Sequence, residues 1–345
     1  MIRIDDDRLI FDFSQVHPCA VLRVRFQRTL RIPDDGRDHF LPPGLGDFPL
    51  RNVDDPALRA PTRWLERGGV ALPMYRSEAM WIDFESEWVS SRATSYPFAV
   101  KIAAGRINAV SGARWRRGLQ RKPRQGYVVV PDQPWLDGYC VEEGLIRQFV
   151  AMPLGSGYSA EEQLTGEAEH GGLQIEAYPM KREQFERRFA EHDPRDSDPW
   201  RVTEEEPTFC YSAPNDMGLA AGGRMRQEIY EDAYGHRVWN RERRSACFVH
   251  LADSLVWSRI AGEQPPTAPP TARDYSEAGL PWFDYYDESS SAVKGSDELK
   301  KLKSVVELDA EKNNVSLPEN QSVDPRRIVQ LRRGMRSDQV REGVG

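Results

Sequence analysis

Hydrophobic and polar positions alternate over short stretches in the first half of the chain. The alternation is clear over residues 9–13 and 20–26. Further apolar segments, several of them rich in β-branched or aromatic residues, cover 79–84, 98–103, 127–130, 146–152 and 173–178. A period of two residues is typical of half-buried antiparallel strands, and Gly or Pro bounds several of these segments. The pattern predicts short strands that follow one another without intervening helices.

Helical signals are fewer and come later in the chain. Residues 159–170 start with Ser159 and carry Glu162 three positions on, which is the spacing of a capping box. Other stretches with helical spacing of apolar residues cover 182–191, 253–261 and 296–312. Together the elements predict a strand-dominated α+β fold, as a sandwich or a barrel-like sheet system, with a few covering helices and a C-terminal helical arm.

A proline-rich stretch divides the chain. Four prolines occur within residues 264–270, and such a run favours extended polyproline geometry over a helix or a central strand. We therefore expect a β-rich body over 1–262, a linker over 263–271, and an aromatic anchoring segment followed by a helical arm over 272–345. The last dozen residues are expected to be disordered.

Composition narrows the class of protein. The 345 residues include 39% hydrophobic and 29% charged residues, which fits a folded chain, and the net charge is −7. An acidic balance argues against a dedicated nucleic-acid protein. The acidic start of the chain and the lack of a long apolar run predict a cytoplasmic protein without a membrane segment. The four cysteines form no CxxC pair: Cys19, Cys140, Cys210 and Cys247.

Glu167, Glu169 and His170 form the stretch that most resembles a catalytic group. Glu167 and His170 are three residues apart, which on a helix places a carboxylate and an imidazole on one face. These three residues are the candidate acid–base group. The alternative is a solvated acidic helix that ends at His170. Because no second ExxH and no HExxH motif occurs, the sequence predicts no metal site, and no cofactor is expected.

Two arginines follow a pair of glycines. Arg224 and Arg226 come after Gly222 and Gly223, and exposed backbone N–H groups with guanidinium groups suit a phosphate or carboxylate ligand. The order is neither that of a P-loop nor that of GxGxxG. Arg224 and Arg226 are therefore candidate anion ligands. The alternative is a glycine turn before an amphipathic element, with both arginines in ion pairs.

Two further segments suggest binding. Residues 280–288 concentrate four aromatic and three acidic residues, among which Trp282 and Tyr285 are candidate ligand contacts. The same residues would also serve to anchor the C-terminal arm to the body. The loop at 114–124 groups Arg and Lys residues around one Trp, which suits contact with phosphates and a stacked base, or simply a solvated hairpin loop.

These features leave three functional hypotheses open. The first is a non-enzymatic binding or assembly protein that engages a protein partner, or itself, through aromatic and Arg residues and the C-terminal arm. The second is an enzyme that acts on an anionic small molecule, with an Arg clamp and a Glu/His acid–base group. The third is nucleic-acid contact through the loop at 114–124.

Overall fold

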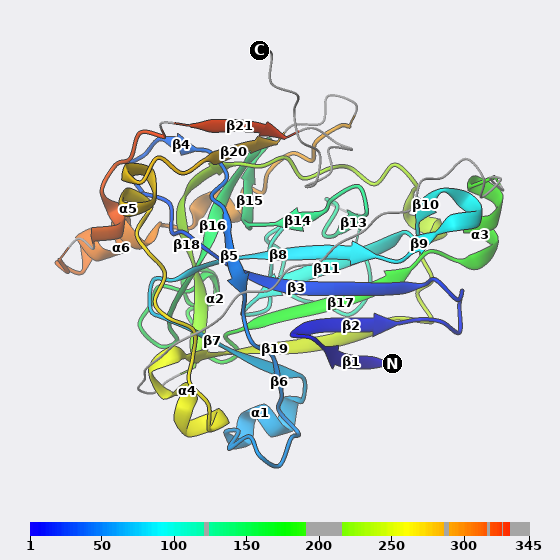
Figure 1. Cartoon of the computed structure of the whole chain (residues 1–345), viewed down its shortest axis with the longest axis horizontal. Helices are drawn as coiled ribbons and strands as arrows, with labels where there is room; N and C mark the ends of the chain where they lie inside the picture. Colours follow the sequence, from blue (N-terminus) through cyan, green and yellow to red (C-terminus); the bar gives the residue numbers. More distant parts are fainter. Residues whose placement is uncertain (121–123, 191–215, 286–289, 316–317, 326, 332–345) are drawn as a thin grey trace.

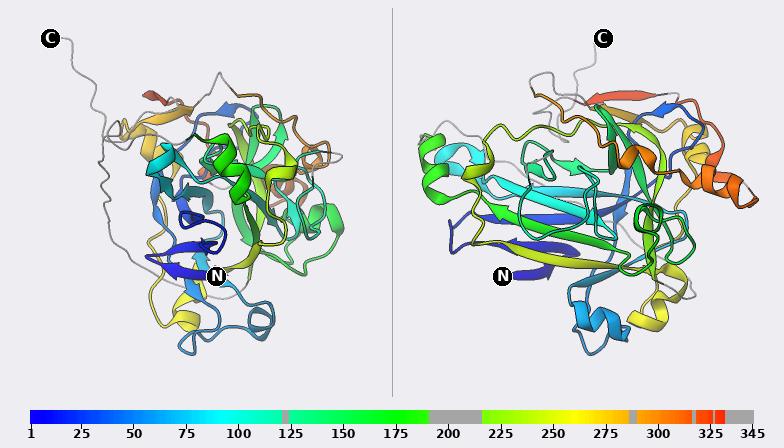
Figure 2. Two further views of the ribbon diagram at one scale, coloured as in Figure 1. Left: turned by 90° about the vertical axis from the view of Figure 1, so that its right-hand side faces the viewer. Right: turned by 180° about the vertical axis from the view of Figure 1, so that it is seen from behind.

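The computed structural model describes residues 1–120, 124–190, 216–285, 290–315, 318–325 and 327–331. Strands predominate in this part of the chain and form two large sheets. The inner faces of the two sheets contribute to one hydrophobic core, so the sheets pack as a sandwich (Figures 1 and 2). The prediction of a strand-dominated α+β fold is confirmed.

The first sheet is mainly antiparallel. Along its main path, β18 and the short β4 are the only neighbours that run parallel within the described residues. Its central pair, β3 and β8, stays in register from Leu22 opposite Ser86 to Thr29 opposite Ala79. The strands are β1 (Ile2–Asp5), β2 (Arg8–Asp12), β3 (Val21–Thr29), β8 (Ala79–Ser86), β16 (Leu145–Pro153), β18 (Met217–Arg226) and β4 (Asp38–His39), with β5 (Gly44–Asp47), β14 (Trp135–Leu136) and β15 (Gly138–Glu142) at the sides.

The second sheet forms the other layer of the sandwich and contains both antiparallel and parallel strand pairs. Its described strands, in order, are β12 (Ile107–Asn108), β11 (Phe98–Ala104), β17 (Leu173–Pro179), β19 (Ser245–Asp253), β7 (Val70–Met74) and β6 (Arg51–Asn52), with β13 (Val128–Val130) beside β11. Two small ribbons pair β9 (Trp88–Val89) with β10 (Thr94–Ser95) and β20 (Trp282–Tyr285) with β21 (Ile328–Leu331). The pairing of β19 with β7 is parallel, whereas β11, β17 and β19 are antiparallel.

The core lies between the two sheets and follows from alternation along their strands. On β3, Val24 and Phe26 are fully buried, and on β17 Leu173 and Ile175 are fully buried in the same cluster. Because successive side chains of a strand point to opposite faces, the residues between these positions point away from the core. On the second sheet, those outward positions carry the candidate site.

The helices are short and cover the ends of the sandwich. They are α1 (Thr62–Arg67), α2 (Ala160–Thr165), α3 (Arg182–Arg188), α4 (Ser254–Ala261), α5 (Ala272–Glu277) and α6 (Val305–Glu311). Figures 1 and 2 show α1 and α4 together at one end of the molecule. There Trp64 and Trp257 share a hydrophobic cluster, and the N–H of Arg59 donates to the carbonyl oxygen of Ile260.

Two expected helices are shorter than the sequence predicts. The capping box at Ser159 and Glu162 is present, but α2 ends at Gly166, whose φ of 75° lies in the left-handed region that terminates helices. The continuous helix expected over 296–312 is replaced by a 3₁₀ turn over Leu299–Lys301 and by α6, which starts from its own capping box at Ser304.

The proline-rich stretch and the residues that follow it pack against the body. The hydroxyl of Tyr75 donates to the carbonyl oxygen of Pro266 at 2.9 Å. Val305 and Leu308 of α6 are buried in a cluster with Val150 of β16. The expected disordered end of the chain lies outside the described residues.

Candidate anion-binding site

The outer face of the second sheet carries charged and polar side chains. Leu173 and Ile175 of β17 point into the core, so Gln174 and Glu176 point outward. The register places Lys101 of β11 directly opposite Glu176. Opposed residues of neighbouring strands project from the same face of a sheet, so these two charges meet on the outer face.

The pair of Lys101 and Glu176 is buried beneath a loop. Their side chains are 2% and 1% exposed, and Lys101 Nζ lies 3.7 Å from Glu176 Oε2. The ammonium group lies 4.0 Å from the centroid of the Trp115 ring and donates to the carbonyl oxygens of Arg116 and Gly118. Burial lowers the pKa of Lys101 below its ordinary value, and the charge of Glu176 acts in the opposite direction. Lys101 thereby holds this loop on the sheet.

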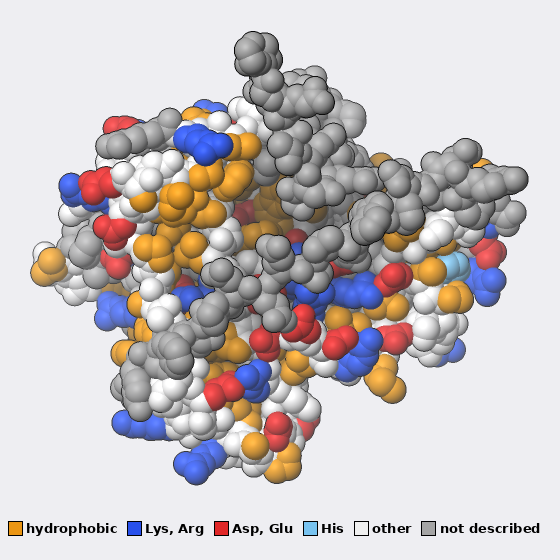
Figure 3. Space-filling view, in the orientation of Figure 1, with side chains coloured by type: hydrophobic (Ala, Val, Ile, Leu, Met, Phe, Trp, Pro, Cys, Tyr) orange, Lys and Arg blue, Asp and Glu red, His pale blue; other side chains and the backbone are white. Residues whose placement is uncertain are grey.

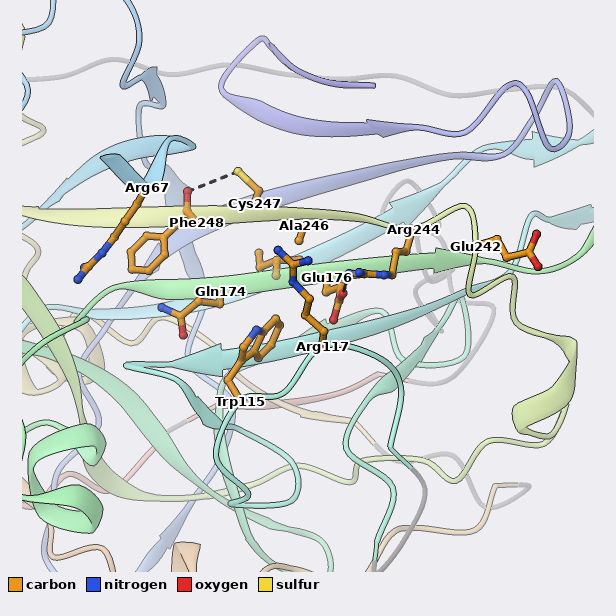
Figure 4. Close-up of a pocket in the computed structure, with 11 residues that line it drawn as sticks. Arg67, Trp115, Arg117, Gln174, Glu176, Glu242, Arg244, Ala246, Cys247 and Phe248 are labelled. Atoms are coloured by element: carbon orange, nitrogen blue, oxygen red, sulfur yellow. Dashed lines mark hydrogen bonds and ion pairs between the residues drawn. The ribbon is translucent and has the colours of Figure 1, made fainter. Parts of the chain in front are cut away.

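A pocket of about 460 Å³ opens beside this loop (Figure 4). Three separate segments supply its arginines: Arg67 ends α1, Arg117 lies in the loop after β12, and Arg244 comes directly before β19. Trp115 and Phe248 supply two aromatic rings. The other lining residues are Gln174, Ile175, Glu176, Glu242, Ala246 and Cys247.

The pocket carries more positive than negative charge. Its buried carboxylate, Glu176, forms an ion pair with Arg244 and also lies beside the buried lysine below it. Arg67 donates to two backbone carbonyl oxygens instead of a carboxylate. Arg117 is exposed and forms no ion pair with any residue that the structure describes. Glu242, also exposed, is the second carboxylate of the lining, so the arginines exceed the acids.

More arginines surround the pocket. Arg114 and Arg116 flank Trp115 along the chain and are exposed, as is Arg243 beside Arg244. This local excess of positive charge contrasts with the net charge of −7 of the whole chain. A local field of this kind attracts anions even when the protein as a whole is acidic.

The outer face of the first sheet has a different charge pattern. On β3 and β8, Arg25 pairs with Asp83 at 2.8 Å, and Arg23 contacts Glu85 and Glu87. Acidic and basic side chains lie next to one another over much of the surface seen in Figure 3. The excess of arginine around Trp115 is therefore a feature of the second sheet and not of this face.

His170 is held near this basic face by a buried carboxylate. Its Nδ1 lies 2.9 Å from Oε1 of Glu161, which is 2% exposed and also accepts the N–H of Gly171. Nη1 of Arg106 lies 3.2 Å from His170 Nε2. Arg67 donates to the carbonyl oxygen of His170 at 3.1 Å, which links the histidine to the pocket.

The other two predicted acid–base residues lie beyond the end of α2. The helical spacing expected for Glu167 and His170 is wrong, because the helix stops at Gly166. Glu167 is exposed. Glu169 is 63% exposed, with its Oε1 3.5 Å from His170 Nε2. The carboxylate that orients the imidazole is Glu161, which the sequence pattern does not single out.

Arg224, Arg226 and Tyr285 line a different pocket, of about 380 Å³. Arg224 Nε lies 2.8 Å from Asp38 Oδ1, and the Arg226 guanidinium lies 5.0 Å from the centroid of the Phe40 ring. The remaining lining residues are Glu142, Glu143, Gly144, Leu145, Gln227, Glu228 and Asp284. Carboxylates outnumber the two arginines in this pocket, and like charges oppose the binding of an anion.

The strand β18 separates the predicted acid–base group from the predicted Arg clamp. The N–H of Gly172, two residues after His170, donates to the carbonyl oxygen of Met217 at the start of β18. Arg224 lies seven residues further along this strand. At about 3.3 Å per residue, Arg224 lies roughly 23 Å along the strand from Met217. The two groups share no cleft, so one small substrate does not reach both.

The tryptophans pack mainly inside the protein. Trp88 is 50% exposed and is the only aromatic residue among the large exposed hydrophobic side chains of the described chain. The indole N–H of the candidate ligand contact Trp282 donates to the Ser276 hydroxyl at 3.0 Å. Four tryptophans are fully buried: Trp64, Trp239, Trp257 and Trp282.

Local sequence patterns do not single out Arg67 or Arg244. Lys101 does leave a signal, because it is the one charged residue in the apolar strand Phe98–Ala104. A lysine within such a strand needs a partner when it is buried. Which carboxylate provides that partner depends on the pairing of β11 with β17.

Searches for metal-ligand groups and membrane-spanning helices in the part of the chain that the structure describes, and for similar proteins, found no match. No group of three or more His, Cys, Asp or Glu side chains among the described residues is placed to hold a metal ion. No helix in the described ranges is long and apolar enough to cross a membrane. No protein-family model, curated protein or solved structure matches the chain.

Proposed function

We propose that the chain is a non-catalytic binding protein whose ligand is a single-stranded nucleic acid, bound on the outer face of the second sheet. The observation that supports this proposal most is the pocket beside Trp115, in which arginines from three segments surround two aromatic rings. This pocket contains part of the basic loop at 114–124.

The chemistry of the lining suits a phosphate backbone that carries flat bases. A guanidinium group binds phosphate oxygens through two parallel hydrogen bonds, and aromatic rings stack on bases without regard to sequence. One face of the Trp115 ring is covered by Lys101, which leaves stacking to its other face. The exposed Arg114, Arg116 and Arg243 extend the positive surface beyond the space of one nucleotide.

The two other hypotheses receive less support from the same geometry. Assembly through aromatic residues needs exposed rings, whereas Trp282 and three other tryptophans are enclosed. Catalysis on a small anion needs the acid–base group near the Arg clamp, and β18 keeps His170 and Arg224 apart.

The proposal is tested by fluorescence anisotropy with a short fluorescein-labelled oligothymidylate. We expect affinity to fall steeply between about 50 and 200 mM salt, because several phosphates are neutralised. Arg117→Gln should weaken binding about tenfold, since a charged hydrogen-bonded contact contributes on the order of 1.5 kcal/mol. Arg273→Gln, on the exposed face of α5, is the matched control and should leave the affinity unchanged.

Two outcomes would contradict nucleic-acid binding. One is the absence of binding at the lowest salt concentration. The other is an equal loss of affinity in Arg117→Gln and Arg273→Gln, which would indicate nonspecific attraction to positive charge anywhere on the surface.

A further inference from the structure

A groove of about 570 Å³ lies between the open edges of the two sheets. One side is lined by Ile2 and Ile4 of β1, and the other by Ala246 and Cys247 at the start of β19. The groove shares Arg67, Ala246, Cys247 and Phe248 with the pocket described above but extends to the edge of the sandwich, beside the strand labelled β1 in Figure 1.

The strand β1 presents an unpaired backbone edge to this groove. In the described chain, β1 pairs only with β2. Met1 and Asp12 of β2 donate backbone hydrogen bonds to each other's carbonyl oxygens. Along an antiparallel ladder, every second residue of a strand forms such a pair with its neighbour. Arg3 is therefore the next residue bonded to β2. The N–H and C=O groups of Ile2 and Ile4 point the other way, toward the groove.

The start of β19 presents a second unpaired edge. The strand β7 pairs with β19 only from Val249 onward. A Cβ on Gly69 would lie 2.1 Å from the carbonyl oxygen of Phe248, so the polar backbone groups of Phe248 point to the β7 side. Backbone direction alternates along a strand, so the groups of Ala246 point to this side too, beyond the end of β7. Ala246 is exposed.

The unpaired edges decide which kind of occupant fits. The base of the groove is apolar, with Leu9 fully buried and Val70 4% exposed. An acyl chain would match these residues but would remove water from the edge N–H and C=O groups without replacing their hydrogen bonds, which is costly. An extended peptide provides both the apolar side chains and the backbone partners.

We propose that this groove binds an extended segment of a partner protein, which adds as a strand to the edges of β1 and β19. Alternate side chains of the segment pack on Leu9 and Val70. At the rim, Arg3 and Arg67 outnumber the single acid Asp54, which favours acidic residues at the outward positions of the segment. This interaction does not depend on nucleic-acid binding by the neighbouring pocket.

The peptide side is tested with a display library of random hexapeptides selected on the full chain. The selected peptide is synthesised again with one backbone N-methyl group at a central residue, which removes an N–H donor and keeps every side chain. Affinity should fall about tenfold, the loss expected for a backbone hydrogen bond together with an unsatisfied carbonyl. N-methylation of the terminal residue is the control and should change the affinity less than twofold.

The protein side is tested at Ala246. Ala246→Pro removes the N–H that points into the groove, and Ala246→Ser retains it. The Pro variant should bind the selected peptide about tenfold more weakly, whereas the Ser variant should match the parent. Hydrogen exchange on the unmodified chain gives a second readout, because the amides of Ile4 and Ala246 should become protected when the peptide is added.

Any one of four results would overturn the proposal. The centrally N-methylated peptide binds as well as the parent peptide, or the amides of Ile4 and Ala246 exchange equally fast with and without peptide. Palmitate binds in the groove while no library peptide does, which would identify an acyl ligand. The chain forms a dimer that Ala246→Pro abolishes, which would identify a second copy as the occupant.

Discussion

Asp137 shows how one buried residue couples the fold to pH. Its carboxyl group is 3% exposed, at the junction of β14 and β15, and the side-chain amide of Gln227 donates to its Oδ2 at 2.6 Å. Burial raises its pKa to about 7, although the hydrogen bonds from Gln227 and Trp135 act in the opposite direction. The carboxyl group therefore changes its protonation close to neutral pH.

The pKa of Asp137 predicts a loss of stability as pH rises. An unfolded Asp loses its proton near pH 4, whereas the folded chain keeps this proton until about pH 7. As pH rises between these values, the free energy of unfolding falls by about 1.4 kcal/mol per pH unit, up to a few kcal/mol in total. Asp137→Asn should thus be more stable than the parent near pH 8 and similar to it near pH 4, as measured by urea unfolding.

His250 makes a second contribution to the pH dependence of stability, which is the same in Asp137→Asn and the parent. Its ring stacks on Trp64, and burial lowers its pKa to about 4. The folded chain therefore loses stability as pH falls from about 6.5 to 4, in the parent and the variant alike. The difference between the two proteins removes this contribution. Parallel pH profiles for Asp137→Asn and the parent would show that the Asp137 carboxyl is not protonated at neutral pH.

At the scale of elements, β18 differs most from its expected form. The glycines at 222 and 223 predict a turn, but they lie in the middle of a strand. A Cβ on Gly223 would lie 2.3 Å from the carbonyl oxygen of Pro33. Gly222 would place a Cβ 2.5 Å from Val150 Cγ2 on the neighbouring strand β16. Close packing, not a turn, requires both glycines.

This packing predicts that Gly223→Ala destabilises the fold. The carbonyl oxygen of Pro33 belongs to the backbone and cannot rotate away, so the chain must shift, at a cost of about 1–3 kcal/mol. Gly126→Ala is the control, because its Cβ would lie no closer than 3.2 Å to the flexible Ser111 side chain. Equal urea midpoints for Gly223→Ala and the parent would contradict the close approach.

At the scale of the whole molecule, residues on both sides of the proline-rich stretch share one core. Trp282, Leu299 and Leu302 belong to the same hydrophobic cluster as the strands of the two sheets. The backbone of Ser296 donates to the carbonyl oxygen of Cys140 at 3.0 Å. The division of the chain at 263–271 remains a prediction about sequence organisation, but these contacts tie the segments together energetically.

The shared core predicts one cooperative unfolding transition for the full chain. Scanning calorimetry should show a single peak, because the C-terminal segments cannot leave without exposing the core. Trp282→Ala should lower the midpoint of the whole peak, with a cost of about 3–5 kcal/mol for a buried Trp. Trp88→Ala, at a half-exposed position, is the control. Two peaks, of which Trp282→Ala moves only one, would contradict a shared core.

Local patterns in the sequence were sufficient for many of the elements. Alternation predicted β2 and β3, because burial of one face imposes a period of two on a strand, and short apolar segments predicted β8, β11 and β17. The capping signal at Ser159 marked the start of α2, because a side chain that caps a helix lies within a few residues of the amides it bonds. The sequence predicts helix ends less reliably than helix starts. A helix is expected over 159–170, but α2 ends at Gly166.

Only the tertiary structure decided which residues form the candidate site. Arg67, Arg117 and Arg244 belong to three distant segments, and the packing of α1 and of the loop after β12 onto the second sheet brings them to one pocket. Likewise, Glu176 becomes the partner of Lys101 through strand register. Strand register and the packing of the layers depend on contacts between residues far apart along the chain. The spacing of residues within one segment therefore does not determine them.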